Sequence, residues 1–238
     1  MNNTTILKNH IYGAKMCKRL YQNPRKNAML HYNKKDHNLY VVLQGTNTIY
    51  HWIHNFSLLL TKDEGIHTGF KKYAELCKNE LIDDILMNKC LKDIESFDEI
   101  DNVYFTAHSL GASAILILVY ELLKQKYFDN KYLSDINVDI VLFGSPKSGN
   151  DQFNKEFNKL INNHSNINIY RYNLKYDLIP HYPPIDIYSH VCDDIILENE
   201  NMEMKQVFNN HSINSYINQL ENYYFALRKN NFIFKDIP

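Results

Sequence analysis

The chain has 238 residues, of which 45% are hydrophobic, and this size and composition suit one domain of the larger kind. We therefore expect residues 1–238 to form a single domain. Its 26 basic and 27 acidic side chains are spread along the whole chain and leave a net charge of −1. Because no basic tract or acidic tail stands out, the sequence does not indicate electrostatic capture of nucleic acid.

The first part of the chain predicts a helix, a pair of strands and two further helices. Residues 8–21 carry a partly apolar face with helical spacing. Residues 28–32 and 39–43 are apolar and rich in β-formers, and the polar turn between them predicts a hairpin. Helical spacing returns over 48–60 and again over 70–85.

The rest of the chain alternates between strands and helices. Four segments read as strands, the last of them as one strand or two: 103–106, 138–143, 167–172 and 188–197. Three segments read as helices: 109–126, which is strongly apolar, 154–161 and 211–227. This alternation predicts the α/β class, with a mostly parallel central sheet and helices on both of its faces.

The strongest local signal surrounds Ser109. A strand runs directly into a tight turn at this serine and then into a helix, which is the arrangement of a nucleophile elbow. An elbow serine takes a strained backbone conformation, so the residues two before and two after it must be small, as Ala107 and Gly111 are. A helix N-terminus also favours a developing oxyanion. The plainer alternative is a serine that only caps the apolar helix.

The sequence His108-Ser109-Leu110-Gly111 resembles the elbow of the class 3 (fungal-type) lipases, and other blocks of that family follow in the same order. These blocks are Gln44-Gly45-Thr46, Trp52, Ile66-His67-Thr68-Gly69-Phe70, Phe143-Gly144-Ser145-Pro146, Gly149-Asn150, Asp177-Leu178-Ile179-Pro180, Tyr188-Ser189-His190 and His211 with Tyr216. The resemblance covers about residues 28–225 and implies an α/β-hydrolase fold and a serine lipase. The sequence departs from the family pattern at three positions, Gln44, Asn55 and Ala107, where Arg, Asp and Gly are usual.

A serine nucleophile needs a base that is itself oriented by a carboxylate, and α/β-hydrolases place them in the order Ser, Asp or Glu, His. Asp177 follows an apolar strand, and the resemblance makes it the triad aspartate. The weaker carboxylate candidates are Asp186, Asp193 and Asp194. For the base we favour His211, at the start of the last helix, over His190, which lies in a strand-like run that suits a structural histidine. His181 lies too close to Asp177 to fold back onto it.

Two backbone N–H groups are expected to form an oxyanion hole. Leu110 supplies one by geometry, because it follows the nucleophile. Thr46 resembles the second donor of the family, and it could equally cap a following helix. We assign no chemistry to His108, which should point away from the serine, or to His67, which should tie its own loop.

The helix expected at 48–60 carries Trp52, Ile53 and Phe56 along one side. The resemblance makes it a candidate lid that covers Ser109 and makes peripheral contact with a lipid surface, although an ordinary core-facing helix would show the same pattern. Lipid esters such as triglycerides, other acylglycerols or phospholipids are then the expected substrates. Two alternatives stay open, namely a phospholipase or acyltransferase with the same triad, and an inactive lipase-like module that binds lipid or protein.

Other classes of site and segment are not indicated by the sequence. The histidines lack metal-ligand spacing, so we expect neither a metal nor a cofactor. The four cysteines lie far apart and are expected to be reduced thiols: Cys17, Cys77, Cys90 and Cys192. No secretory signal or apolar run of about 18 residues is present, so we expect no transmembrane segment and a cytoplasmic or other intracellular location, unless a signal was removed.

Overall fold

The computed structural model describes residues 2–46, 59–86, 99–129, 134, 136–198 and 210–230. Most of the helix expected at 48–60, including Trp52, lies outside the described residues, as does Cys90. Leu60, at the end of that segment, forms an isolated antiparallel bridge with His67.

A six-stranded sheet forms the middle layer of the fold. Its strands lie in the order β1 (Ala28–Asn33), β2 (Asn38–Leu43), β3 (Asn102–His108), β4 (Asn137–Phe143), β6 (Ile167–Leu174) and β8 (Ile195–Leu197). The β1–β2 hairpin is antiparallel, and every other neighbouring pair is parallel. The short strands β5 (Gly149–Asn150) and β7 (Tyr188–Ser189) pair with each other outside this sheet. The sequence segment 188–197 therefore contributes to two different sheets.

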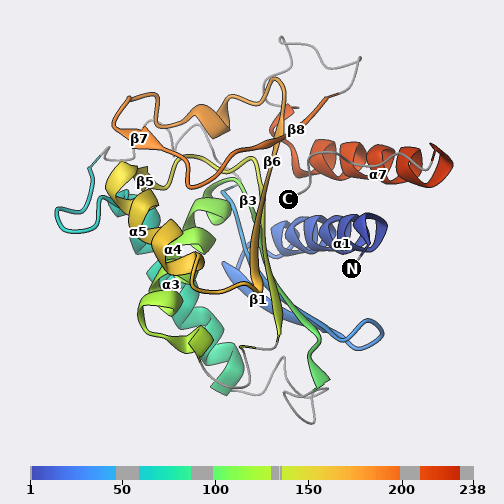
Figure 1. Cartoon of the computed structure of the whole chain (residues 1–238), viewed down its shortest axis with the longest axis horizontal. Helices are drawn as coiled ribbons and strands as arrows, with labels where there is room; N and C mark the ends of the chain where they lie inside the picture. Colours follow the sequence, from blue (N-terminus) through green and yellow to red (C-terminus); the bar gives the residue numbers. More distant parts are fainter. Residues whose placement is uncertain are drawn as a thin grey trace.

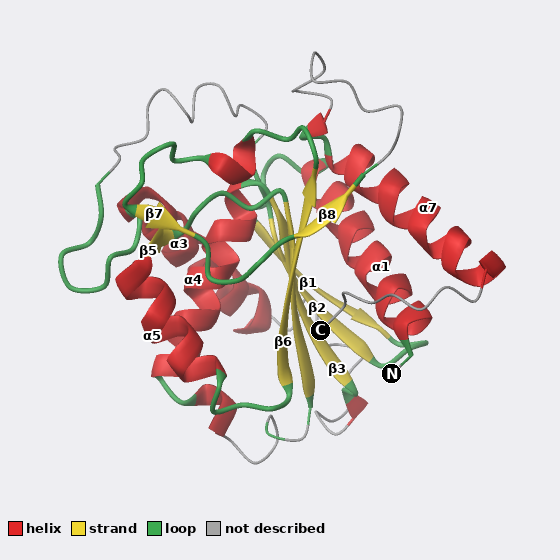
Figure 2. Ribbon diagram, turned by 45° about the horizontal axis from the view of Figure 1, so that its top comes forward, coloured by secondary structure: helices red, strands yellow, loops and turns green. Residues whose placement is uncertain are grey.

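Helices cover both faces of the sheet. Helices α1 (Asn3–Tyr21) and α7 (Ile213–Asn230) lie side by side on one face, and α3 (Thr68–Leu86), α4 (Leu110–Lys124) and α5 (Asp151–Ile161) lie on the other (Figures 1 and 2). Two buried hydrophobic clusters fill the two interfaces. The expected α/β class, with a mostly parallel sheet between helical layers, is thus confirmed.

The first helix begins five residues earlier than the sequence pattern predicts. The Asn2 side chain accepts a hydrogen bond from the Thr5 backbone N–H at 2.9 Å and so caps the helix before its apolar face starts. At its other end the carbonyl of Leu20 accepts a hydrogen bond from Gln44 Nε2 at 2.8 Å, which ties α1 to the segment after β2. The departure from the family pattern at Gln44 therefore has a structural use.

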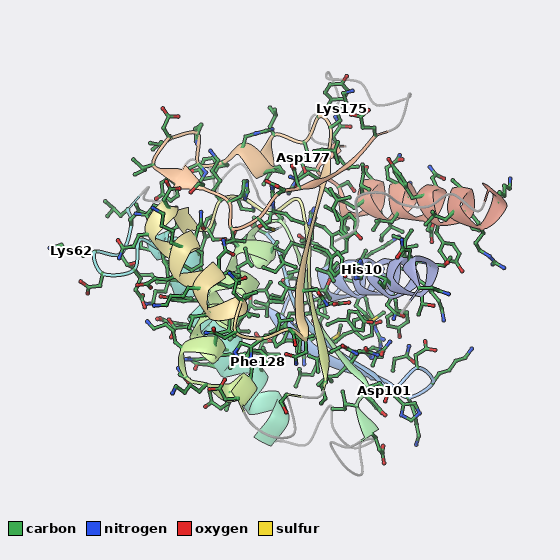
Figure 3. The ribbon with its side chains drawn as sticks, viewed as in Figure 1. His10, Lys62, Asp101, Phe128, Lys175 and Asp177 are labelled. Atoms are coloured by element: carbon green, nitrogen blue, oxygen red, sulfur yellow. The ribbon has the colours of Figure 1, made fainter. Side chains whose placement is uncertain are left out.

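The parallel strands all end at one edge of the sheet. The carboxyl ends of β2, β3, β4 and β6 lie at the same edge, where ligand sites of open α/β sheets are found. Asp177, which follows β6, lies at this edge, and Asp101, which precedes β3, lies at the opposite end of the sheet (Figure 3).

Three further features of the described part of the chain bear on what a membrane span, a disulfide and a metal site require. No helix there has the length and apolar character needed to cross a membrane. The thiols of Cys17, Cys77 and Cys192 are free. Within the same residues no group of three His, Cys, Asp or Glu side chains is placed to hold a metal ion.

Candidate active site

Ser109 joins β3 to α4 in a strained turn. Its backbone has φ 61° and ψ −132°, a conformation that a residue with a Cβ rarely adopts. The side chain makes no capping hydrogen bond to the helix, although Ser109 occupies the N-cap position. Its backbone N–H is held by the Phe143 carbonyl at 2.9 Å. The alternative interpretation of Ser109 as a helix cap therefore fails, and the geometry is that of an elbow.

Two glycines allow the elbow to pack against the end of β2. A Cβ on Gly111 would lie 2.7 Å from the Leu43 carbonyl oxygen, a contact that real Cβ atoms do not make. A Cβ on Gly45 would lie 2.6 Å from the His108 carbonyl oxygen and 3.1 Å from Ser109 Cβ. The turn after β2 thus touches the serine directly. Ala107, where the family has Gly, is fully buried.

Asp177 and His211 form a buried pair although 34 residues separate them. His211 Nδ1 lies 2.7 Å from Asp177 Oδ2, and both side chains are almost fully enclosed. The Tyr216 hydroxyl donates to the same Oδ2 at 2.6 Å, and the Ile179 backbone N–H donates to Asp177 Oδ1 at 2.9 Å. Three donors thus hold the carboxylate in one orientation, which sets the position of the imidazole.

Gly144, at the end of β4, makes room for this pair. Its φ is 56°, in the region that favours glycine. A Cβ there would lie 2.8 Å from Tyr216 Oη, 3.0 Å from Asp177 Oδ2 and 3.0 Å from His211 Cε1. The close approach of this backbone brings the pair to the corner where the Phe143 carbonyl holds Ser109.

Two buried polar atoms stand out at this corner. Ser109 Oγ and His211 Nε2 are both shielded from solvent, and neither has a hydrogen-bond partner among the described residues. Leaving a buried donor or acceptor unsatisfied costs about 1–3 kcal/mol, so such atoms call for an explanation. A nucleophile and its base would leave two atoms in this state, because catalytic hydrogen bonds are often long before substrate binds.

The backbone behind the serine carries the predicted oxyanion donors. Leu110 is the first residue of α4 and is buried. Thr46 is half-buried and directly follows Gly45, which touches the elbow. The turn that holds Thr46 is secured on one side by the Tyr73 hydroxyl, which donates to the Gln44 carbonyl at 2.8 Å.

The other candidate residues lie apart from the buried pair. His190 Nε2 donates to the Pro180 carbonyl at 2.7 Å, and burial lowers the pKa of this histidine to about 4. His181 is exposed in the short 3-10 helix Ile179–His181. The weaker carboxylate candidates are all exposed: Asp186, Asp193 and Asp194. His67 accepts hydrogen bonds from the backbone N–H groups of Gly69 and Phe70, so it caps α3.

The sequence by itself indicates no role for three residues that lie at this site. Tyr216 was part of a family block, but nothing in the sequence connected its hydroxyl to Asp177. Tyr21 reaches the elbow from α1, where its hydroxyl donates to His108 Nδ1 at 2.8 Å. Gly144 belonged to another block, and only its positive φ in the folded chain reveals its purpose.

Comparison with known proteins agrees with this geometry. The sequence model described as lipase (class 3) matches residues 40–187, which is more than half of the chain. The chain belongs to the lipase (class 3) family. The match includes the elbow and Asp177, whereas Tyr21 and His211 lie outside it.

Individual proteins match this chain at low sequence identity or over a short stretch. The chain is 31% identical over 86 residues to phospholipase A1-IIdelta of Arabidopsis thaliana, a stretch that covers 36% of this chain and 19% of the plant protein. A Rhizomucor miehei lipase in complex with its propeptide superimposes with a TM-score of 0.62 at 18% identity, over 83% of this chain and 70% of that one.

A second similar structure is a triacylglycerol lipase whose catalytic centre is formed by a serine protease triad. It has a TM-score of 0.57 and 24% identity, and the match covers 72% of this chain and 62% of that one. The chain thus spans about a fifth of the plant relative and less than two thirds of this lipase. At these identities the structural matches establish the shared fold.

Proposed function

We propose that this member of the lipase (class 3) family is a serine carboxylic ester hydrolase that cleaves lipid esters through an acyl-enzyme. One observation carries the proposal: an unpartnered, buried Ser109 Oγ at a strained elbow shares a corner of the fold with an unpartnered His211 Nε2. The opposite ring nitrogen of that histidine is held by the buried carboxylate of Asp177 at 2.7 Å. The inactive binding module has no use for such an arrangement.

In the acylation step Ser109 Oγ attacks the ester carbonyl and transfers its proton to His211 Nε2. Asp177 holds the imidazole by Nδ1 and stabilises the imidazolium that forms. The tetrahedral intermediate then collapses, the bond to the alcohol breaks, and His211 Nε2 returns the proton to the departing alkoxide. The acyl group remains as an ester of Ser109.

In the deacylation step water replaces the alcohol. His211 Nε2 takes a proton from the water as it attacks the acyl-enzyme, and then gives the proton to Ser109 Oγ as the acid leaves. In both steps the negative charge on the carbonyl oxygen would be held by the backbone N–H groups of Leu110 and Thr46. The Gly45 turn against Ser109 supports this assignment of the second donor.

Long-chain acylglycerols are the substrates that we propose first, since the similar solved structures are lipases. A second candidate is hydrolysis of a phospholipid acyl ester. It is favoured by the relative in Arabidopsis thaliana, which is a phospholipase A1. The two candidates use the same triad and differ in the alcohol that leaves, so emulsified trioleoylglycerol and phosphatidylcholine vesicles, assayed side by side, distinguish them.

Labelling with a fluorophosphonate probe tests the proposed mechanism, because the probe reacts with an activated serine. We expect wild-type protein to take the label and Ser109→Ala to lose both the label and ester turnover, by about 10³-fold or more. Ser113→Ala is the matched control, since the Ser113 hydroxyl is buried in the same helix and donates to the Pro146 carbonyl at 2.8 Å. Retained turnover in folded Ser109→Ala would mean that another residue is the nucleophile.

A further inference from the structure

A buried hydrogen-bonded connection runs from the N-terminal helix to the back of the base. The Tyr21 hydroxyl, at the end of α1, lies 2.8 Å from His108 Nδ1. On the other side of that ring, His108 Nε2 lies 2.8 Å from the backbone carbonyl oxygen of His211. The rings of His108 and His211 also pack against each other, with their centroids 4.6 Å apart.

The partners determine which nitrogen of His108 carries the proton. A carbonyl oxygen only accepts hydrogen bonds, so Nε2 must donate to His211. Nδ1 of the neutral ring is then an acceptor, which the Tyr21 hydroxyl satisfies. Burial, and next the neighbouring His211, lower the pKa of His108 well below its usual range, so the ring stays neutral. A neutral neighbour does not oppose the charge that His211 would acquire as a base.

The same tyrosine also touches the turn that carries the predicted oxyanion donor. Tyr21 Oη lies directly against the backbone of Gly45. A Cβ on Gly45 would lie 2.0 Å from Tyr21 Oη, so only glycine permits this approach. One hydroxyl group therefore contacts both the turn before Thr46 and the histidine that supports His211.

We propose that Tyr21 and His108 are positioning residues of the hydrolase, a role that rests on the function proposed above. Together they hold the His211 backbone and the Gly45 turn in fixed relation to Ser109. Neither residue exchanges a proton or forms a bond in the reaction: Tyr21 acts through His108 and Gly45, and His108 acts through its contacts with His211. Because displacement of reacting groups by about 1 Å can cost about 100-fold in rate, a connection that holds two of the groups at once affects turnover more than folding.

The test compares a tyrosine that touches the site with one that does not. Tyr21→Phe removes the hydroxyl from the connection. Tyr104→Phe is the matched control, because the Tyr104 hydroxyl joins the sheet to the same helix through Asn9 Nδ2, at 2.8 Å, without contact with the site. For each variant we would measure kcat and KM on a short soluble nitrophenyl ester, the rate of fluorophosphonate labelling, and the melting temperature.

Two substitutions of His108 separate the two ends of the connection. In His108→Gln the amide nitrogen can still donate to the His211 carbonyl, whereas in His108→Asn the shorter amide can only keep the contact with Tyr21. If the connection acts through His211, Gln should preserve more turnover than Asn.

We expect Tyr21→Phe and His108→Asn to lose about tenfold in kcat and in labelling rate, with KM changed by less than about twofold. Tyr104→Phe should lower the melting temperature to a similar extent and leave kcat unchanged. The inference is overturned if Tyr21→Phe keeps wild-type kcat, if Tyr104→Phe loses as much, or if Asn outperforms Gln. Wild-type protein that takes no label and hydrolyses no ester would instead overturn the proposed function, and this inference with it.

Discussion

The Tyr216 hydroxyl lies 2.6 Å from Oδ2 of Asp177. This oxygen is also the one that accepts from His211 Nδ1, so a single carboxylate oxygen orients the imidazole while the tyrosine stabilises its negative charge. The tyrosine is itself placed by the Leu174 backbone N–H, which donates to Tyr216 Oη at 3.3 Å. The carboxylate is thus held by a tyrosine of α7 that is itself anchored to β6.

Replacing Tyr216 by Phe should lower kcat without changing KM. A charge-assisted hydrogen bond contributes about 1.5–3 kcal/mol, so a loss of about tenfold or more is expected for ester hydrolysis. Tyr172→Phe is a suitable control, because that hydroxyl is also buried and bonds His10 Nδ1, at 2.8 Å, on the α1 side of the sheet. Steady-state kinetics on a soluble ester would check this, and equal kcat for Tyr216→Phe and wild type would contradict it.

Gly144→Ala should impair catalysis far more than Gly65→Ala. Both glycines have positive φ, 56° and 66°, so alanine is strained at both and should destabilise each protein by about 1–2 kcal/mol. Only at Gly144 would the new Cβ clash with Tyr216 Oη and crowd the Asp177–His211 pair. At Gly65 it would meet the Asn150 side chain. We expect a loss of about 100-fold in kcat for Gly144→Ala alone. Similar kcat losses in both variants would show that strain itself is responsible.

Glutamine substitutions distinguish the two histidines that follow Asp177. His211→Gln should abolish ester turnover, by about 10³-fold or more, because no base remains to take the serine proton. His190→Gln can still donate to the Pro180 carbonyl and should keep turnover within about threefold of wild type. Rates of fluorophosphonate labelling should follow the same order, with His190→Gln close to wild type and His211→Gln far below it. If His190→Gln lost ester turnover and His211→Gln kept it, our assignment of the base would be reversed.

The buried His67 should lower the free energy of unfolding at mildly acidic pH relative to neutral pH. Burial lowers the pKa of His67 to about 4, against 6.5 for the unfolded chain. Between these values the unfolded state binds more protons, so the stabilisation is complete above pH 6.5 and is lost as the pH falls towards 4. The loss should be on the order of 3 kcal/mol, because one pKa unit corresponds to about 1.4 kcal/mol.

His67→Asn provides the comparison for this pH effect. Asparagine can still accept the hydrogen bonds from Gly69 and Phe70 that cap α3, and it does not take up a proton. Urea unfolding at pH 7 and pH 4.5 should therefore show a smaller acid loss in the variant than in wild type. The same loss in both proteins would assign the acid sensitivity to other groups.

Much of the fold follows from local patterns. Apolar β-rich runs with a polar turn between them specify the β1–β2 hairpin, and strands that alternate with amphipathic helices specify a layered sheet, because each element must bury one face. The elbow is equally local. A strand, a serine between Ala107 and Gly111, and an apolar helix are consecutive in the chain, so their chemistry can be read without knowledge of distant contacts.

The tertiary structure decided which residues far apart in the sequence come into contact. Asp177 is one of several carboxylates after Ser109, and His211 one of three histidines after Asp177; folding joins these two at 2.7 Å and leaves His190 on the Pro180 carbonyl. The hydroxyls of Tyr21 and Tyr216 gain their partners in the same way. These partners share no short spacing, since they meet only when strands and helices from opposite ends of the chain converge on one edge of the sheet.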